Sequence, residues 1–458
     1  MDLKSYTHIY FIGVGGIGMS AIARYLNKMG KCVSGYDKTS TELTKKLESE
    51  GIDIHYEDNP DLLSPDIDLV IFTPAIPDDH KELNHFRSGT LPVIKRAEAL
   101  GMISRDSMAI AVAGTHGKTS TSSMITQLLK SGGCNFSAFV GGIILDDRSN
   151  FIAQGNEWVV LEADEYDRSF LHLNPEIAVL LSMDPDHLDI YDDHNTMKEG
   201  FWEFIQRIND GGKFFYAHRL EPMFPTLWKE ELDKRKIESR SFGIEQGEIQ
   251  AVGIEALKGQ FQFTYINGDM EIKDLLLTMP GNHNVENAIA AISVALQLDV
   301  DPQLIRAGMS GFGGVQRRFE RLFDNGLQIY IDDYAHHPTE LKAAISAARK
   351  LYPEKKLTGI FQPHLYSRTK DFADGFAESL DLLDECILMD IYPARELPIP
   401  GITSDIILSR MNMNSVFRVR DHEVMERLKE NEIEVIMTLG AGDIDLLRNK
   451  IKKWLESQ

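Results

Sequence analysis

Two glycine-rich turns constrain this sequence most, because each follows a short apolar strand and precedes a helical pattern. The first turn is Gly13-Val-Gly15-Gly16-Ile-Gly18, and the second is Gly114-Thr115-His116-Gly117-Lys118-Thr119-Ser120. A strand, a glycine turn and a helix in this order form a phosphate-binding unit, since the turn exposes backbone N–H groups at the helix N-terminus. The sequence therefore predicts two α/β units, each of which binds a phosphorylated ligand.

The rest of the chain continues the same alternation of short apolar runs and amphipathic helical patterns, which is typical of parallel sheets with crossover helices. A chain of 458 residues is too long for one ordinary domain. We expect an α/β fold of three domains in series: a Rossmann-like domain at 1–105, a P-loop-type domain with a mainly parallel sheet at 106–314, and a second Rossmann-like domain at 315–458. We also expect a β-rich insertion at Lys213–Met279, with a hairpin turn at Gly268-Asp269, and a helix at Pro338–Leu351 in the third domain.

The charge and the cysteine content exclude some classes of partner. The formal net charge is −22, from 70 acidic and 48 basic residues, so the average surface repels nucleic acid and anionic lipid. The three cysteines have no metal-ligand spacing. The apolar run Ile9–Ala23 is interrupted by glycines, which argues against a signal peptide, and no other run predicts a membrane span. We expect a cytoplasmic protein with reduced cysteines and without a nucleic-acid or membrane partner.

The first glycine turn has the pattern of a dinucleotide fingerprint. Its glycines permit unusual backbone angles and a close approach of a pyrophosphate, and Asp37 follows where a ribose hydroxyl would be bound. A dinucleotide, another pyrophosphate ligand and a purely structural turn all fit this pattern. The turn alone leaves these three alternatives open.

The second glycine turn favours a nucleoside triphosphate. Backbone donors of Gly114–Ser120 would surround the phosphates, Lys118 would neutralise their charge, and the Thr119 hydroxyl can ligate Mg²⁺. Val112 stands where the commonest P-loop pattern has its first glycine, and a solvent loop that merely contains Gly-Lys-Thr is the alternative. A dehydrogenase has no use for a second phosphate loop. The two turns together therefore favour an enzyme that uses ATP on a nucleotide-carrying substrate.

Seven segments of the chain resemble, in order, the motifs of the Mur ligases. They are GTHGKTS (114–120), EADEYDRSF (162–170), DPDHLDIY (184–191), MPGNHNVENA (279–288), FGGVQRRFE (312–320), DDYAHHPTE (332–340) and FQPHLYSRT (361–369). The resemblance covers essentially the whole chain. It implies an N-terminal domain that binds a UDP-sugar, a central ATPase domain, and a C-terminal domain that closes on ATP and an amino acid.

The resemblance also implies a reaction, which is the ATP-dependent ligation of L-alanine to the carboxylate of UDP-N-acetylmuramic acid. Such a reaction passes through an acyl phosphate, gives ADP and phosphate, needs Mg²⁺ and supplies peptidoglycan precursors. Because every step concentrates negative charge, cations and positioning should dominate catalysis. A recycling ligase that attaches a whole peptide, a nicotinamide oxidoreductase and a silent nucleotide-binding regulator stay open as alternatives. We expect a monomer or a homodimer.

The resemblance assigns residues of the first two domains to ligands. For the sugar nucleotide they are Gly13, Gly15, Gly16, Gly18, Asp37, Thr73 and Pro74. For ATP they are Gly114, Thr115, His116, Gly117, Lys118, Thr119, Ser120, His283, Asn284 and Asn287, the last three on a loop that enters a helix at Val285–Leu296. For Mg²⁺ they are Thr119, Glu162 and His187.

The third block completes the predicted site. Arg317, Asp333 and His337 are implied to contact ATP, and Tyr334, His336 and Arg368 to form the amino-acid pocket. An arginine suits the alanine carboxylate, and a neutral histidine can accept a proton from the attacking amine. The predicted catalytic residues are Lys118, His187, His336 and Arg368. Leu365 departs from the family pattern, which often has an arginine there, so the choice of amino acid is the least constrained part.

Overall fold

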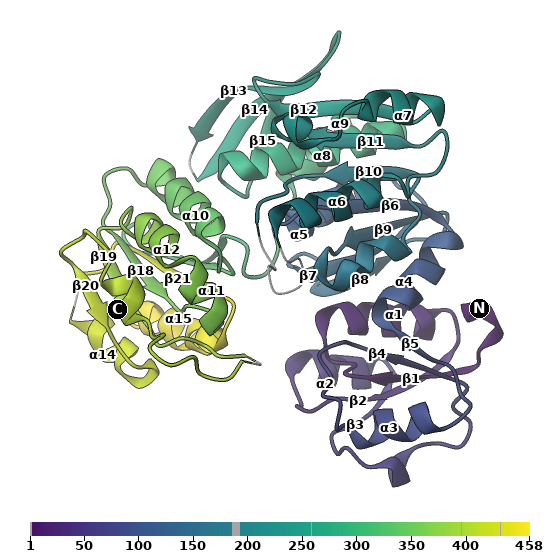
Figure 1. Cartoon of the computed structure of the whole chain (residues 1–458). Helices are drawn as coiled ribbons and strands as arrows, with labels where there is room; N and C mark the ends of the chain where they lie inside the picture. The colour runs from purple at the N-terminus through teal and green to yellow at the C-terminus, as the bar shows by residue number, and fades with distance from the viewer. Residues whose placement is uncertain (1, 186–192, 258, 395, 431) are drawn as a thin grey trace. The chain divides into compact units, whose positions relative to one another are not determined.

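The computed structural model describes residues 2–185, 193–257, 259–394, 396–430 and 432–458 (Figure 1). The chain has the predicted α/β fold, with three mainly parallel sheets. It divides into two compact units. One contains Met1–Ala251, Tyr265–Ile272 and Glu286–Phe312, and the other contains Val252–Thr264, Lys273–Val285 and Gly313–Gln458. In the described part of the chain, every helix is too short or too polar to cross a bilayer.

The first sheet is parallel, with the strand order β3-β2-β1-β4-β5. Its central strand β1 is apolar and almost fully buried, as expected for a parallel strand with both faces covered. The strands are β1 (His8–Ile12), β2 (Cys32–Tyr36), β3 (Asp53–His55), β4 (Leu69–Phe72) and β5 (Val93–Lys95), and the helices are α1 (Ile17–Lys28), α2 (Glu42–Ser49), α3 (Lys81–Ser88) and α4 (Arg96–Arg105). The first glycine turn joins β1 to α1, so it lies at the carboxyl edge of the sheet, where open α/β sheets bind ligands.

The second sheet has the order β15-β14-β13-β12-β11-β10-β6-β9-β7-β8. The strands are β6 (Met108–Ala113), β7 (Phe136–Ile144), β8 (Ser149–Ala153), β9 (Trp158–Ala163), β10 (Ile177–Leu180), β11 (Lys213–Ala217), β12 (Glu238–Ile244), β13 (Ile249–Leu257), β14 (Gln260–Asn267) and β15 (Met270–Leu277). The helices are α5 (Lys118–Ser131), α6 (His194–Ile205), α7 (Trp228–Lys234), α8 (Asn282–Gln297) and α9 (Pro302–Ser310). Strands β10, β6, β9 and β7 run parallel, and β8 is antiparallel.

Two expectations about this region need correction. The segment Lys213–Met279 is not a separate insertion, because β11 pairs in parallel with β10 and continues the central sheet. Only its last part matches the prediction, where the neighbouring strands β14 and β15 flank Gly268-Asp269. The helix predicted at Val285–Leu296 begins earlier, at Asn282. His283, Asn284 and Asn287 are therefore all helical residues rather than loop residues.

The third sheet has the order β16-β17-β21-β18-β19-β20, in which only the pairing of β16 with β17 is antiparallel. The strands are β16 (Glu320–Asp324), β17 (Ile329–Asp333), β18 (Leu357–Phe361), β19 (Glu385–Leu388), β20 (Val416–Arg418) and β21 (Val435–Leu439). The helices are α10 (Pro338–Leu351), α11 (Tyr366–Asp371), α12 (Ala373–Leu380), α13 (Asp405–Leu408), α14 (Val424–Lys429) and α15 (Arg448–Glu456). Helix α10 has the bounds that the sequence predicts.

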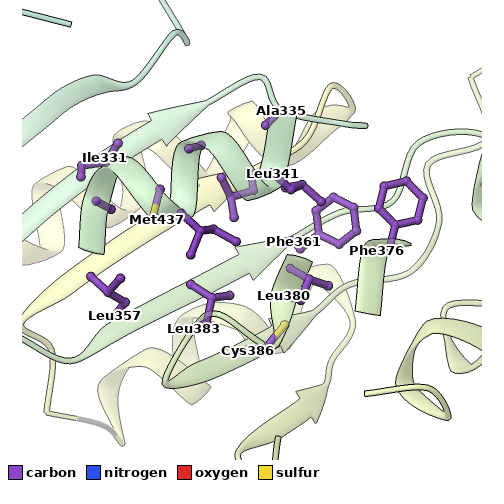
Figure 2. Packing of buried hydrophobic residues seen from close by; sticks show 14 of the residues in the cluster. Ile331, Ala335, Leu341, Leu357, Phe361, Phe376, Leu380, Leu383, Cys386 and Met437 are labelled. Atoms are coloured by element: carbon purple, nitrogen blue, oxygen red, sulfur yellow. The ribbon is translucent and has the colours of Figure 1, made fainter. Parts of the chain in front are cut away.

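A dense apolar core fixes one face of this third sheet. Figure 2 shows strand residues Ile331 and Met437 facing the helix residues Leu341 and Phe376, with Phe361 among them. The rings of Phe361 and Phe376 lie 5.4 Å apart. Each such buried side chain contributes about 1.5–3 kcal/mol from the loss of water contact. This packing holds the loops after β17 and β18, which carry the predicted amino-acid pocket.

Candidate active site

The second glycine turn is a tight connection between β6 and α5. Gly114 and Gly117 have φ angles of 136° and 86°, which L side chains rarely adopt. Gly117 is the N-cap of α5, and a Cβ there would lie 2.7 Å from Asn287 Oδ1. His116 N donates to Ser182 Oγ at 2.8 Å, and the hydroxyls of Thr115 and Ser182 are 3.0 Å apart. The turn is therefore anchored to the segment after β10, in the shape that a phosphate-binding loop needs.

Lys118 is the first residue of α5, and its ammonium group points back across the turn. Nζ donates to Gly114 O and to Glu165 Oε2, both at 2.6 Å. Burial lowers the pKa of Lys118, but the carboxylates of Glu165, Asp164 and Glu162 outweigh burial and raise it above the ordinary value. Lys118 is therefore held in its charged form beside the loop.

Glu162 lies at the same sheet edge, because β9 pairs with β6 in a register that places Glu162 opposite Val112. Thr119 Oγ1 donates to Glu162 Oε2 at 3.1 Å, and Ser122 Oγ donates to Oε1 at 3.0 Å. Gly141 N also donates to Oε1, at 2.6 Å. A hydroxyl and a carboxylate at this spacing are the hard oxygen ligands that Mg²⁺ prefers, so Thr119 and Glu162 fit the predicted metal. Ser120 is buried in the same helical turn.

The third predicted metal ligand, His187, lies outside the described residues. Asp184, which precedes it closely in sequence, has its carboxylate 3.7 Å from the imidazole of His116 in the second glycine turn. The ring of His116 therefore lies between the second glycine turn, called the ATP loop below, and the segment after β10.

The first glycine turn is braced by its neighbours. Gly13 N and Val14 N donate to Tyr36 O at 2.8 and 3.0 Å. Asp37 Oδ2 accepts from Gly15 N at 2.8 Å, so this carboxylate holds the turn in shape, and its role toward a ribose stays a prediction. Thr73 and Pro74 directly follow β4, and the Thr73 methyl lies 2.8 Å from where a Cβ on Gly13 would stand.

A cavity of about 210 Å³ joins elements of both glycine turns. Its wall includes Gly18 from the first turn, Lys118 from the second, and Arg96, Glu162 and Asp164. Arg96 Nη2 donates to Asp164 Oδ2 at 3.2 Å. Two cations and several carboxylates thus surround one space, as a site for an anionic substrate and a metal ion requires.

The predicted amino-acid pocket is a cluster of rings in the second unit. The rings of Tyr334 and His336 are 5.2 Å apart, and those of His336 and His364 are 6.0 Å apart. Arg368 Nη1 lies 3.4 Å from His364 Nδ1, and the ring of Tyr392 stacks on His364. The structure therefore brings Tyr334, His336 and Arg368 together, with His364 between the last two.

His336 has a defined tautomer. Its Nδ1 lies 2.9 Å from Tyr334 O, and a carbonyl oxygen can only accept, so Nδ1 carries the proton. The basic nitrogen is then Nε2. The Glu340 carboxylate lies 3.3 Å from Nδ1 and also accepts from His336 N at 3.1 Å, which fixes the orientation of the ring.

Leu365 has a φ of 72° and a ψ of 138°, which is strained for a branched side chain. Its N donates to Tyr392 O at 2.9 Å, and its own carbonyl accepts from Thr369 N at 3.1 Å. The strained residue directly starts α11, the helix that carries Arg368. These two backbone hydrogen bonds therefore anchor the start of the helix that carries Arg368.

Asp333 and Arg317 are both partly buried in the same unit. Asp333 accepts from Phe319 N at 2.7 Å and from Ala335 N at 2.8 Å. Burial raises the pKa of Asp333 to about 6, although the Arg318 charge opposes the shift. The Arg317 guanidinium donates to Gly440 O, pairs with Asp332 and lies over the Tyr334 ring at 5.1 Å. The predicted contacts of Arg317 and Asp333 with ATP stay predictions.

The other four residues predicted to bind the nucleotide lie on α8 and at the N-terminus of α10. His337 caps α10 and accepts from Thr339 N at 3.3 Å, with its ring 4.8 Å from Phe372. Asn284 is buried and donates to Pro280 O at 2.9 Å. His283 is exposed on the first turn of α8, and Asn287 packs against Gly117. Only Asn287 of these four is therefore placed directly at the ATP loop.

Sequence reasoning missed several residues of this site, and Glu165, Ser182 and Arg96 show why. Glu165 lies three residues after Glu162, so the acidic run at 162–165 carried a signal for it. Ser182 and Arg96 carried none, because their contacts with His116 and Asp164 join segments that are distant in sequence.

The comparisons with known proteins agree with this arrangement. Three family models match the chain in order: the Mur ligase family catalytic domain over residues 8–107, the Mur ligase middle domain over 112–295, and the Mur ligase glutamate ligase domain over 317–446. The UDP-N-acetylmuramate–L-alanine ligases of Flavobacterium johnsoniae and Parabacteroides distasonis are 44% and 43% identical to this chain, over 99% and 100% of its length and 99% of theirs.

Solved structures give the same result. The crystal structure of the UDP-N-acetylmuramate-alanine ligase of Thermotoga maritima has a TM-score of 0.81 and 26% identity, and the match covers 99% of this chain and 100% of that chain. A murein peptide ligase from Psychrobacter arcticus shares the fold, with a TM-score of 0.70 and 23% identity over 98% of both chains. Because the matches span nearly the whole length and include both glycine turns, this chain belongs to the Mur ligase family.

Proposed function

We propose that this protein joins L-alanine to UDP-N-acetylmuramate at the cost of ATP and so supplies a precursor of peptidoglycan. The observation that carries the proposal is the sheet edge where Lys118, Thr119 and Glu162 converge beside a cavity that the first glycine turn also lines. This arrangement serves a triphosphate and a second phosphorylated substrate at once. The sequence relatives that are 43–44% identical over nearly the full chain are named as ligases of this specificity, which favours alanine over a peptide.

The first chemical step transfers a phosphoryl group. A carboxylate oxygen of the sugar nucleotide attacks the γ-phosphorus of ATP, ADP leaves, and an acyl phosphate forms. Thr119 and Glu162 would hold Mg²⁺, which would reduce the negative charge of the phosphates. Lys118 stabilises the charge on the transferred group, and the N–H groups of the loop orient the phosphates.

The second step forms the amide. The amine of L-alanine attacks the acyl carbon, and phosphate leaves from a tetrahedral intermediate. His336 is suited to accept the amine proton, because its tautomer places the basic lone pair on Nε2. Arg368 is suited to hold the alanine carboxylate through a forked hydrogen bond. Both assignments are part of the proposal.

A panel of amine acceptors tests the proposed specificity. Phosphate release is measured with ATP, Mg²⁺ and UDP-N-acetylmuramate while one amine is supplied at a time: L-alanine, glycine, L-serine, or the tripeptide that a recycling ligase would use. The proposal predicts the largest kcat/KM for L-alanine. A preference for the tripeptide would instead assign the chain to the recycling branch.

We also propose a cytoplasmic location, which the nature of the cosubstrate ATP supports. The cysteines are free thiols, and free thiols suit a reducing compartment. Fractionation of cells that express a tagged copy checks this point.

A further inference from the structure

We infer that Arg96 binds an oxyanion of the sugar nucleotide. When the substrate is absent, the Arg96 guanidinium pairs with Asp164 instead. This inference rests on the proposed function, since it assigns a further residue to the same site. Arg96 has no place in the glycine fingerprint or in the ATP loop. Its position is evident only from the folded chain.

The Arg96 side chain lies beside the first glycine turn. Arg96 is the first residue of α4, and its Nη1 lies 2.6 Å from where a Cβ on Gly18 would stand. Gly18 belongs to the fingerprint and to the first turn of α1, where a pyrophosphate meets backbone N–H groups. The absence of a side chain at residue 18 is what lets the guanidinium approach this helix end. An anion held at the turn would therefore be within the range of Arg96.

The two cations in the cavity wall are each paired with a carboxylate. Lys118 is bound to Glu165, and Arg96 is bound to Asp164. Both carboxylates come from the segment after β9, and Glu162 and Asp164 line the same cavity as the two cations. Each cation is thus held by an internal carboxylate at the place where an anionic substrate would enter.

The Arg96–Asp164 pair is partly exposed to solvent. The side chains are 25% and 34% exposed, so the pair is open to exchange, whereas the Glu165 carboxylate is buried. Asp164 has a second role, since its Oδ1 accepts from Tyr166 N at 3.2 Å and holds the turn after β9. Because of this hydrogen bond, the Asp164 side chain can stay in position when Arg96 leaves it to bind a ligand. A forked guanidinium suits either of the two oxyanions that the substrate offers, the pyrophosphate and the carboxylate.

Binding measurements on three variants test the inference. Calorimetry gives Kd values for UDP-N-acetylmuramate, for UDP-N-acetylglucosamine, which has the pyrophosphate but no carboxylate, and for a non-hydrolysable ATP analogue. The variants are Arg96→Ala, Arg96→Lys and the control Arg105→Ala. Arg105 is exposed at the other end of α4, so its loss removes the same charge from the same helix.

We expect Arg96→Ala to raise the Kd for UDP-N-acetylmuramate about ten-fold or more, the scale for losing a charge-assisted hydrogen bond. Arg96→Lys should restore part of the affinity, and the Kd for the ATP analogue should stay within about two-fold of the wild-type value. An equal loss for both UDP-sugars identifies the pyrophosphate as the bound group. A loss confined to UDP-N-acetylmuramate identifies the carboxylate.

Two results would overturn the inference. One is a Kd of Arg96→Ala for UDP-N-acetylmuramate that matches the Arg105→Ala control. The other is a parallel loss of affinity for the ATP analogue together with a lower Tm, which would make the Arg96–Asp164 pair a structural contact only. Binding by the wild-type protein distinguishes a failure of the proposed function from a failure of the Arg96 inference alone. If the wild type binds the ATP analogue but neither UDP-sugar, the proposed function fails, and the inference fails with it.

Discussion

At the scale of single residues, the site is an arrangement of charges that are already paired before any ligand enters. Lys118 illustrates this, because its ammonium is buried against Glu165 and the Gly114 carbonyl. Removing one member of a buried pair leaves the other unpaired and costs several kcal/mol. Substitutions here therefore change both the chemistry and the local stability, and each test needs a control for folding.

Lys118→Ala should lower kcat by roughly 100-fold or more, the scale for losing a preorganised charge that stabilises a transition state. Lys130→Ala is the matched control, because Lys130 lies near the other end of α5 and its pair with Asp147 is partly exposed. Steady-state phosphate release measures both variants. Near-normal turnover of Lys118→Ala would show that the ATP loop does not take part in phosphoryl transfer.

Asp333 should make stability depend on pH. Its pKa is about 6 in the folded protein against an ordinary value of 3.8, so between these values the folded state binds more protons than the unfolded state. The contribution of Asp333 to the free energy of unfolding therefore falls as pH rises through this window. At about 1.4 kcal/mol per unit of pKa shift, the change is on the order of 3 kcal/mol.

The comparison with Asp333→Asn isolates this effect, since asparagine does not titrate. The Tm of the wild type minus that of the variant should decrease between about pH 4 and about pH 7. Thermal melts at matched ionic strength measure the difference. A constant or increasing difference over that range would show that Asp333 titrates near its ordinary value.

At the scale of elements, both glycine turns connect a strand to a helix at the carboxyl edge of a parallel sheet. In the first turn, a Cβ on Gly15 would lie 2.6 Å from the Thr44 methyl and 2.8 Å from Asp37 Oδ2. Gly15→Ala must therefore displace the carboxylate that braces the turn. A local strain of about 1–3 kcal/mol should raise the KM for the sugar nucleotide roughly 5- to 100-fold and leave the Kd for ATP unchanged.

Gly89→Ala is the control for this substitution in the same domain. A Cβ on Gly89 would meet only backbone oxygens of Phe86 and His85, at 3.4 and 3.8 Å, which are ordinary contacts. Its KM for the sugar nucleotide should match that of the wild type. If Gly15→Ala behaves in the same way, the first turn does not bind the substrate.

The elements themselves were largely predictable, because strands and helices here follow strong hydrophobic periodicity. Helix α10 has its predicted bounds, since His337 caps it and Pro338 starts it. The sequence favours an insertion at Lys213–Met279 because the strand-like run at 260–268 and the turn Gly268-Asp269 predict a hairpin, whereas the pairing of β11 with β10 depends on distant residues. Arg96 and Ser182 were missed for the same reason, since no local pattern encodes a contact that only the tertiary fold creates.

At the scale of the whole molecule, the two glycine turns and the predicted amino-acid pocket lie in different compact units. Both glycine turns belong to one compact unit, and Tyr334, His336 and Arg368 belong to the other.

A ligand that binds the folded protein stabilises it, so the proposed substrate should raise the free energy of unfolding. UDP-N-acetylmuramate at about 100 times its Kd should add about 2.7 kcal/mol to the free energy of unfolding and raise the Tm.

NADH at the same concentration should leave the Tm unchanged, because the proposed function assigns the first glycine turn to a UDP-sugar and not to a nicotinamide dinucleotide. A thermal-shift assay with both ligands makes the comparison. Stabilisation by NADH but not by the UDP-sugar would favour the oxidoreductase alternative.

The central claim is that the γ-phosphoryl group of ATP moves onto the substrate carboxylate. The most direct measurement uses UDP-N-acetylmuramate with oxygen-18 in its carboxylate, together with ATP, Mg²⁺ and L-alanine. Because phosphate leaves with the oxygen that attacked the γ-phosphorus, mass spectrometry should find one labelled oxygen in each phosphate and one in each amide product. Unlabelled phosphate, formed while the UDP-sugar keeps both labelled oxygens, would contradict the account.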